Sequence, residues 1–382
     1  MEKEMLEAEI RRLRPVSADS HVTEPPDCYA PRLDKKFRDR APYLVDDPEK
    51  GAQFILEGMK PIRIGSLAAA GVPPSEIKAQ QARTFDRLHR GGWDPKARIA
   101  DMERDGVAGE VIYPSIGMVV FFIPDIELAS ACCRAYNLWL EEYCSAVPDR
   151  LFGIGQSAAA SPQELVEDIT RIKAQGLRGV MLPLEPGVAD YDDPIYEEAW
   201  AAAVEFNLPL SFHVLPRTKT GGHAAMQKAR GGNLANVMNI TRLNQEVVNT
   251  FVLGGVFERL PKLKLICVEA DAGWVPHYAS RMDHAWERFR NMLDSTSLNN
   301  PPSKYLLENV YFTFQDDVIA MKTAHLMNPK RLLWASDFPH NDSTWPHSMH
   351  LLERHTEGIP DDTVRKIVRD NVIELYKLSV TA

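Results

Sequence analysis

The sequence predicts an α/β protein built as a closed (β/α)8 barrel, the TIM barrel. Short apolar runs alternate with amphipathic segments, eight such runs can be counted, and their continuous apolar character is typical of parallel strands covered on both faces. A doubly wound open sheet is the competing fold. It would need a glycine-rich phosphate-binding turn after its first strand, and neither GxGxxG nor GxxxxGK[ST] occurs in the sequence.

The expected strands follow one another along almost the whole chain. They cover residues 15–21, 110–113, 151–155, 178–182, 208–213, 263–269, 310–314 and 331–336. Helical patterns between them cover residues 131–147, 162–174, 196–206, 275–290 and 318–326. We expect residues from about 25 to 92, rich in proline, glycine and charge, to form an insertion after the first strand. Helices over about 344–382 should complete a single domain that spans residues 1–382.

The composition excludes several classes of partner. Acidic residues outnumber basic ones by 53 to 44, and the formal net charge of -9 gives no general attraction to nucleic acid or anionic lipid. The five cysteines are scattered, which is typical of reduced thiols used as small apolar residues. The N-terminus mixes both signs of charge and lacks the apolar core of a signal peptide. We therefore expect a cytoplasmic protein with a small-molecule substrate.

Polar residues end several of the expected strands. Asp19 and His21 lie two apart at the end of the first strand, so both side chains project to the same side. His213 ends the fifth strand, Glu269 ends the sixth, and Asp337 follows the eighth. Each residue alone can be an ordinary polar strand end. Together they point to an active site, because barrel enzymes build it at the carboxyl ends of the strands.

Two imidazoles and two carboxylates form a set that suits a divalent cation. Buried carboxylates side by side repel each other and need a positive charge between them. We expect Zn²⁺, Mn²⁺ or Fe²⁺ here, with coordination positions left for water and substrate. The expected ligands are Asp19, His21, His213 and Asp337.

Further candidate ligands raise the possibility of two cations per chain. Glu24, Glu269 and His340 follow the same strands, and Glu24 or Glu269 would have to bind the second ion. The apolar residues 180–183 at the end of the fourth strand contain no lysine, so a carbamylated-lysine bridge is not expected.

Several ordered motifs resemble one known family. They read ADSHVTEP over residues 18–25, DMERDGV over 101–107, GVFERLP over 255–261 and SDFPH over 336–340. Over about residues 15–376 the sequence resembles the amidohydrolase-related family that includes the aminocarboxymuconate-semialdehyde decarboxylase-like enzymes. The resemblance implies a metal-dependent barrel enzyme whose ligands match the four residues named above.

The sequence departs from the pattern of those decarboxylases in two places. Asp19 stands where His or Glu is usual, which exchanges one ligand for another. Glu269 stands where they usually carry a His, in a His-Gly-Gly context. A carboxylate at this position favours a hydrolase, in which metal-activated water attacks a C–N or C–O bond of a small organic acid or amide. Asp337, Glu269 and His340 are then the candidate catalytic residues.

Three alternatives stay open. In a non-oxidative decarboxylase of an aromatic or unsaturated acid, Glu269 could deliver the proton only if burial or a neighbouring anion raised its pKa. A dinuclear iron or manganese oxygenase would use the second cation. A non-catalytic binding protein would be expected to lack one or more ligands, and none of the four is missing.

The substrate side of the site is less defined. Arg63, Arg98 and Arg217 lie in or beside expected loops and could pair with a substrate carboxylate, and we select Arg217 because it closely follows His213. Residues 218–232 after it could act as a lid. Association into a homo-oligomer, most simply a dimer, is expected from the resemblance.

Overall fold

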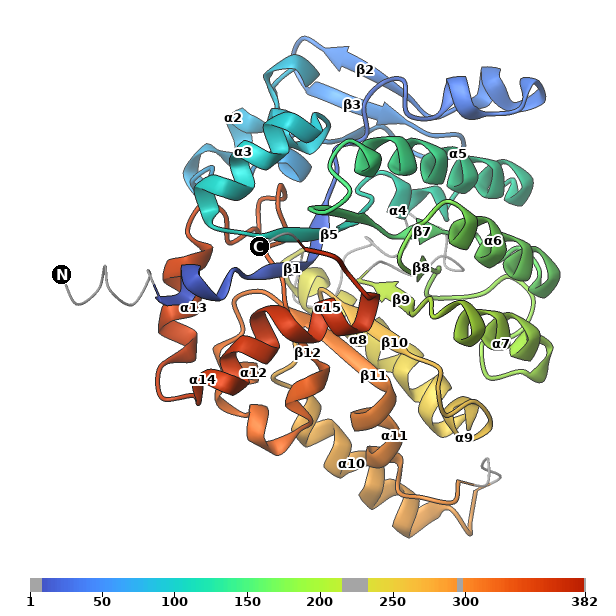
Figure 1. Cartoon of the computed structure of the whole chain (residues 1–382). Coiled ribbons are helices and arrows are strands. Elements are labelled where there is room, and N and C mark those ends of the chain that lie inside the picture. Colours follow the sequence, from blue (N-terminus) through green and yellow to red (C-terminus); the bar gives the residue numbers. More distant parts are fainter. Residues whose placement is uncertain (1–8, 215–232, 294–297, 381–382) are drawn as a thin grey trace.

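The computed structural model describes residues 9–214, 233–293 and 298–380 (Figure 1). Within this part of the chain, eight strand positions run parallel to one another, with β6 and β7 forming one position. The strands are β1 (Val16–His21), β5 (Gly109–Tyr113), β6 (Leu151–Gly153), β7 (Gly155–Gln156), β8 (Val180–Met181), β9 (Leu210–His213), β10 (Leu265–Val268), β11 (Val310–Phe314) and β12 (Leu332–Trp334). The predicted (β/α)8 fold class is confirmed.

Hydrogen bonds show how the strands follow one another around the sheet. One part has the order β1-β5-β6 and the other the order β12-β11-β10-β9-β8-β7. β6 pairs with β5 and β7 pairs with β8, and only Ile154 separates them. At the other junction, the backbone N–H of Asp337 donates to the carbonyl of Asp19 at 3.0 Å, and that of His21 donates to Phe338 at 2.6 Å. These bonds bring the two ends of the strand order together.

Helices lie between the strands and after them. Those between the strands are α3 (Pro95–Asp105), α4 (Gly117–Val120), α5 (Ile126–Ser145), α6 (Pro162–Ala174), α7 (Glu197–Phe206), α8 (Asn233–Leu253), α9 (Val256–Arg259), α10 (Val275–Phe289), α11 (Pro302–Asn309) and α12 (Val318–Lys322). The helices α13 (Ser348–Thr356), α14 (Asp361–Arg365) and α15 (Asn371–Tyr376) follow β12, and α15 contacts β1 and β12.

The largest error in the predicted bounds is at the start of α5. The sequence pattern predicts a start at residue 131, but the helix begins at Ile126. The carboxylate of Asp125 accepts hydrogen bonds from the backbone N–H groups of Glu127 and Leu128, which caps the helix. The cap, rather than the apolar periodicity, sets this boundary.

The segment after β1 carries a small sheet of its own. β2 (Tyr43–Asp47), β3 (Gly51–Ile55) and β4 (Ile62–Arg63) pair antiparallel in this order, and the short helix α2 (Ile77–Gln80) follows them. Figure 1 shows β2 and β3, in blue, away from the parallel strands and near α5. The predicted insertion is therefore an antiparallel addition to the barrel.

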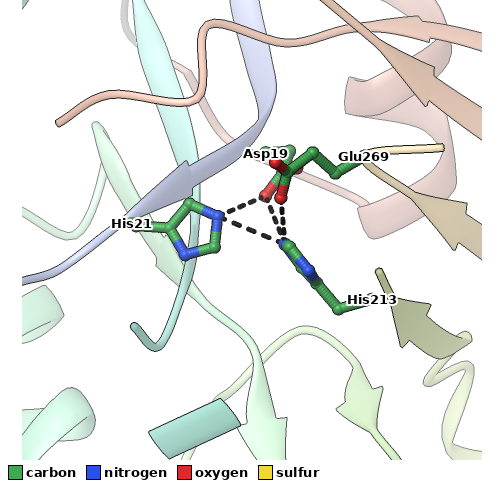
Figure 2. Close-up of side chains that lie close together, drawn as sticks. All are labelled: Asp19, His21, His213 and Glu269. Atoms are coloured by element: carbon green, nitrogen blue, oxygen red, sulfur yellow. Dashed lines mark hydrogen bonds and ion pairs between the residues drawn. The ribbon is translucent and has the colours of Figure 1, made fainter. Parts of the chain in front are cut away.

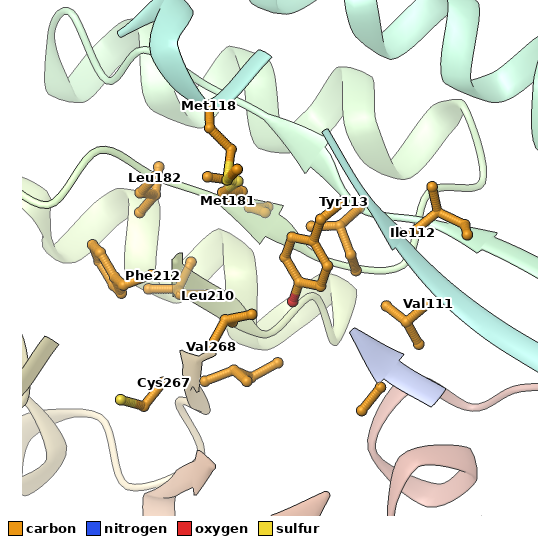
Figure 3. Packing of buried hydrophobic residues seen from close by; sticks show 14 of the residues in the cluster. Val111, Ile112, Tyr113, Met118, Met181, Leu182, Leu210, Phe212, Cys267 and Val268 are labelled. Carbon is orange, nitrogen blue, oxygen red and sulfur yellow. The ribbon is translucent and has the colours of Figure 1, made fainter. Parts of the chain in front are cut away.

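The core lies among the parallel strands and between these strands and the helices. Figure 3 shows apolar side chains from β5, β8, β9 and β10 gathered together. Val111, Met181, Leu210 and Val268 have no exposed surface. All five cysteines are buried and none forms a disulfide. Within the described residues, none of the helices has the length and apolar character needed to cross a membrane.

Gly153 in β6 leaves no room for a side chain. A Cβ added there would lie 2.7 Å from Leu140 Cδ2 and 2.8 Å from Leu177 Cδ2. We expect Gly153→Ala to reduce the free energy of unfolding by about 1–3 kcal/mol, measured by urea denaturation. The matched control is Gly187→Ala, where an added Cβ meets nothing within 4 Å. Equal stability of the two variants would contradict this account of the packing.

Candidate metal and catalytic centre

The strand ends bring the predicted site residues to one place. β1 carries Asp19 and His21, β9 ends with His213, and Glu269 directly follows β10. Asp337 lies three residues after β12. The side chains of Asp19, His21, His213 and Asp337 have no exposed surface, while that of Glu269 is 20% exposed. Glu269 is therefore the member of the cluster that reaches solvent.

Four of these side chains point toward one another (Figure 2). The Nε2 atoms of His21 and His213 are 3.2 Å apart. Asp19 Oδ1 lies 3.4 Å from the first and 3.7 Å from the second of these nitrogens. Glu269 Oε2 lies 3.2 Å from His213 Nε2. One ligand atom from each of the four residues lies within 4.8 Å of all the others, a spacing that can hold a metal ion.

A second, overlapping group adds Asp337 and His340. It consists of His21, Glu269, Asp337 and His340, again with ligand atoms within 4.8 Å of one another. Asp337 Oδ1 lies 3.3 Å from His21 Nε2 and 3.0 Å from His340 Nδ1. The His340 and His21 rings stack with centroids 3.9 Å apart. Both groups include His21, and only its Nε2 is free, because Nδ1 is hydrogen-bonded to the carbonyl of Pro114. Two cations therefore cannot each bind all four ligands of their group.

Hydrogen bonding leaves imidazole lone pairs facing the carboxylates. His21 Nδ1 lies 2.7 Å from the carbonyl oxygen of Pro114, which can only accept a hydrogen bond, so Nδ1 carries the hydrogen. The lone pair of Nε2 then faces Asp19, Asp337 and His213. Both side-chain oxygens of Asp19 and of Asp337 are buried without a hydrogen-bond partner. A convergence of acceptors with orphaned carboxylate oxygens fits a divalent cation at this point.

The carboxylates also raise one another's proton affinity. Burial, together with the charge of Asp337, raises the pKa of Glu269 well above its usual value. Burial raises the pKa of Asp337 to about 8, and the charge of Asp19 adds to this. Burial lowers the pKa of His340 to about 3. Asp337 can therefore carry a proton near neutral pH when no cation is bound, and Glu269 binds a proton more tightly than an exposed glutamate does.

At two other residues of the cluster, Asp19 and His213, the neighbouring charges favour the ionised form of the side chain. Burial would raise the pKa of Asp19, but the imidazoles of His213 and His21 outweigh it and hold that pKa well below its usual range. Burial would lower the pKa of His213, but Asp19 and Glu269 raise it to about 9. In the absence of a cation the site thus takes up a proton on His213.

Glu24 does not lie in either group of potential ligands. Its buried carboxylate accepts hydrogen bonds from the backbone N–H groups of Ser115, Ile116 and Gly117 at 2.8–3.0 Å. Burial raises its pKa to about 7, and these three bonds oppose the shift. The structure does not place Glu24 with the residues expected to bind a second cation, because its oxygens are already used by the main chain.

The candidate arginines have different positions. Arg98 is fully buried and pairs with Glu110 at 2.5 Å, so it is not available to a substrate carboxylate. Arg63 lies in β4 of the antiparallel sheet. Arg217 and the predicted lid over residues 218–232 lie outside the described residues.

The sequence pattern does not predict two features of the site. Ser115 Oγ lies 2.8 Å from His340 Nε2, although 225 residues separate the two in the chain. Glu269 and Asp337 have left-handed backbone conformations, with φ of 58° and 54°. This conformation is unfavourable for residues other than glycine. At Glu269 and Asp337 it changes the direction of the side chain just after β10 and β12 end.

A barrel that gathers buried imidazoles and carboxylates at the carboxyl ends of its strands defines the class of metal-dependent TIM-barrel enzymes. The family model described as amidohydrolase matches residues 19–378. The chain therefore belongs to the amidohydrolase family, and the family resemblance found in the sequence is confirmed. It is an enzyme of the amidohydrolase superfamily, so the alternative of a non-catalytic binding protein is wrong.

Individual relatives are distant. The chain is 22% identical over 259 residues to a 2-amino-3-carboxymuconate-6-semialdehyde decarboxylase of Dictyostelium discoideum, covering 67% of this chain and 69% of that protein. An amidohydrolase from Mycobacterium avium subsp. paratuberculosis has a similar structure, with a TM-score of 0.78 and 23% identity over 95% of this chain and 97% of its own. A 5-carboxyvanillate decarboxylase from Novosphingobium aromaticivorans, solved with manganese and 4-hydroxy-3-methoxy-5-nitrobenzoic acid, has a TM-score of 0.65 and 19% identity, covering 95% and 96%.

Proposed function

We propose that this enzyme is a metal-dependent, non-oxidative decarboxylase of a small aromatic or unsaturated carboxylic acid. The observation that carries the proposal is the buried cluster of imidazoles and carboxylates whose ligand atoms lie within 4.8 Å of one another, with Asp337 Oδ1 3.0 Å from His340 Nδ1 beside it. The sequence relative from Dictyostelium discoideum and the manganese-containing structural relative, both decarboxylases, support the same reaction. This reverses the order expected from the sequence, which placed hydrolysis first because of Glu269.

Asp19, His21 and His213 would hold the cation, with Glu269 in the same group of ligand atoms. Manganese, zinc and iron all suit this mixture of imidazole and carboxylate. A bound divalent cation supplies a positive charge that binds the substrate's carboxylate and adjacent hydroxyl group and stabilises negative charge on them. The substitution of Glu269 for the histidine usual in the decarboxylases then adds a carboxylate ligand.

Asp337 and His340 would handle the proton. Decarboxylation breaks the bond between the carboxyl group and its carbon, and a proton must take the place of the departing carbon dioxide. Burial raises the pKa of Asp337 to about 8 in the metal-free protein, and His340 Nδ1 lies 3.0 Å from its Oδ1. Asp337 therefore donates the proton to the substrate carbon, and His340 keeps the donor group oriented.

The second candidate reaction is hydrolysis, favoured by the position of Glu269 in both ligand groups. A carboxylate at that place could take a proton from an attacking water molecule. The dinuclear oxygenase has less support, because Glu24 lies apart and His21 has only one free ring nitrogen.

Product analysis tests the proposal. The Mn²⁺-loaded protein is incubated in D₂O with a panel of hydroxybenzoic and unsaturated acids, and carbon dioxide and deuterium at the former carboxyl position are measured. We expect equal amounts of both. Cleavage of an amide or ester panel, without release of carbon dioxide from any acid, would instead establish hydrolysis.

Metal binding should depend on pH in a defined direction. A cation at His213 displaces the proton that this residue holds, with a pKa of about 9, so the affinity for Mn²⁺ rises as pH rises toward that value. At 100 times the dissociation constant, Mn²⁺ should stabilise the fold by about 2.7 kcal/mol. Calorimetric titration of the metal-free protein with Mn²⁺ at several pH values measures the affinity. An affinity independent of pH would contradict the predicted role of His213.

We also propose a substrate contact for Arg217, a dimeric assembly and a cytoplasmic location, which follow from the sequence alone. Arg217→Met, with the Michaelis constant as readout, tests the contact, since loss of a substrate-binding guanidinium raises that constant. Sedimentation velocity tests the assembly.

A further inference from the structure

The turn after β5 holds two imidazoles of the site at once. The carbonyl of Pro114 accepts a hydrogen bond from His21 Nδ1 at 2.7 Å. The next residue, Ser115, places its hydroxyl oxygen 2.8 Å from Nε2 of His340. One short segment thus contacts histidines that arrive from β1 and from the residues after β12.

The hydroxyl of Ser115 determines which nitrogen of His340 carries the hydrogen. Ser115 Oγ also lies 2.7 Å from the carbonyl oxygen of Val22, which can only accept. The single hydroxyl hydrogen goes to Val22, so His340 Nε2 must donate to Ser115. The lone pair of Nδ1 then faces Asp337 Oδ1 at 3.0 Å. His21 and His340 both therefore direct a lone pair into the site.

Glu24 fixes the position of this turn. Its carboxylate accepts three consecutive backbone N–H groups, those of Ser115, Ile116 and Gly117. The side chain of Glu24 has no exposed surface. A rotation of the peptide units in this turn would move the Pro114 carbonyl and the Ser115 hydroxyl together.

We propose that Glu24 is a positioning residue, which acts through the turn over residues 114–117 to fix the tautomers and orientations of His21 and His340. Glu24 belongs to neither group of potential cation ligands. The expected effect on turnover rests on the proposed decarboxylase function, while the expected effect on the imidazoles does not. Groups that orient metal ligands typically change metal affinity or activity by about 10–100-fold when they are removed.

The test uses the full chain and four variants. Glu24→Gln removes the charge and places an amide N–H₂ against the backbone donors. Ser115→Ala removes the hydroxyl contacts to His340 and to the Val22 carbonyl but keeps the backbone N–H that Glu24 accepts. Ser115→Thr keeps the hydroxyl. Ser130→Ala is the matched control, because Ser130 is buried and its hydroxyl has no hydrogen-bond partner.

Three readouts separate positioning from general destabilisation. Histidine ring nitrogens of the Zn²⁺-loaded protein are observed by ¹⁵N NMR, affinity is measured with Mn²⁺ alone, and thermal unfolding is followed in parallel. In Glu24→Gln, we expect both His21 and His340 to lose their fixed tautomers and the Mn²⁺ affinity to fall about 10–100-fold. In Ser115→Ala, only His340 should change, and Ser115→Thr should restore it.

Two results would overturn the proposal. One is a Glu24→Gln protein whose histidine spectra and Mn²⁺ affinity equal those of the original chain. The other is a Ser115→Ala protein that changes no more than Ser130→Ala. If Glu24→Gln does not fold, the comparison of Ala and Thr at position 115 decides. Absence of carbon dioxide release would remove the decarboxylase function and leave these spectroscopic results to judge the positioning role.

Discussion

Asp337→Asn should lower kcat by about 10²–10⁴-fold, the usual contribution of a positioned general acid. The amide keeps the size of the side chain but has no acidic proton to deliver to the substrate carbon. Asp337 is fully buried, with His340 Nδ1 at 3.0 Å and His21 Nε2 at 3.3 Å from its Oδ1, so no solvent group is in place to deliver the proton instead. The rate of carbon dioxide release at saturating substrate, with Mn²⁺ in excess, measures the effect.

The pH dependence gives a second, independent measure of the same proton. Asp337 loses its proton as pH rises through its pKa, about 8 in the metal-free protein, so kcat should fall on the alkaline side. A bound cation favours the ionised carboxylate and moves this limb to lower pH. The alkaline limb should disappear in the Asn variant.

The matched control is Asp342→Asn. Asp342 is exposed, and its charge contributes to the raised pKa of Asp337 without belonging to either ligand group. We expect kcat to change by less than about threefold and the alkaline limb to move slightly to lower pH, because a nearby negative charge has been removed. If both variants lost activity equally, the field of the acidic cluster would be responsible, and Asp337 would not be the proton donor.

The convergence of Asp19, His21, His213 and Asp337 was predictable because it follows from chain topology. Parallel strands in a barrel end on one face, so a polar residue at the end of any strand is placed without knowledge of its contacts. The pattern of apolar runs locates those ends to within a few residues, as for β11 and β9. The predicted strand ends alone were therefore enough to predict that these residues, remote in the sequence, lie close together.

Glu24 shows where this argument fails. It lies three residues beyond the end of β1, and the sequence offers a carboxylate but not the direction in which it turns. Its three partners are backbone N–H groups more than 90 residues away, which carry no side-chain identity for a sequence pattern to detect. Arg98 was ambiguous for the same reason, since its acceptors include the carbonyl of His21.

The order of the candidate reactions depended on a different point. The residue type of Glu269 is visible in the sequence, but its protonation depends on burial and on the distances to Asp337 and His213. A carboxyl group can be a base, an acid or a ligand at the same position. The proposal that Asp337 donates the proton and Glu269 binds the cation rests on the three-dimensional environment of these two residues.

Replacing Arg98 should have the largest effect on stability. Arg98 and Glu110 form an ion pair in which the two side chains are 0% and 3% exposed. The guanidinium also donates to the carbonyls of His21 at 2.6 Å and Phe338 at 3.3 Å, and it lies over the Phe338 ring. Arg98→Met leaves the carboxylate of Glu110 buried and unpaired, so the free energy of unfolding should fall by about 3–5 kcal/mol. Urea denaturation of the metal-free protein measures it.

A double variant and a surface control separate charge from packing. Arg98→Met combined with Glu110→Leu removes both charges and should recover part of the loss. Arg90→Ala breaks the pair between Asp94 and the exposed side chain of Arg90 and should cost less than about 1 kcal/mol. If Arg98→Met were no more destabilising than Arg90→Ala, the buried pair would not support the fold.

The stability of the Arg98 pair is linked to the site through the main chain. The carbonyls it binds belong to His21, a predicted cation ligand, and to Phe338, which adjoins Asp337. Those two strand ends are themselves joined by the hydrogen bond from the His21 N–H to the Phe338 carbonyl. Arg98→Met should therefore lower Mn²⁺ affinity in the protein that remains folded, whereas Gly153→Ala should leave it unchanged. An Arg98→Met protein with reduced stability and unaltered Mn²⁺ affinity would show that this arginine supports the barrel without aligning the ligands.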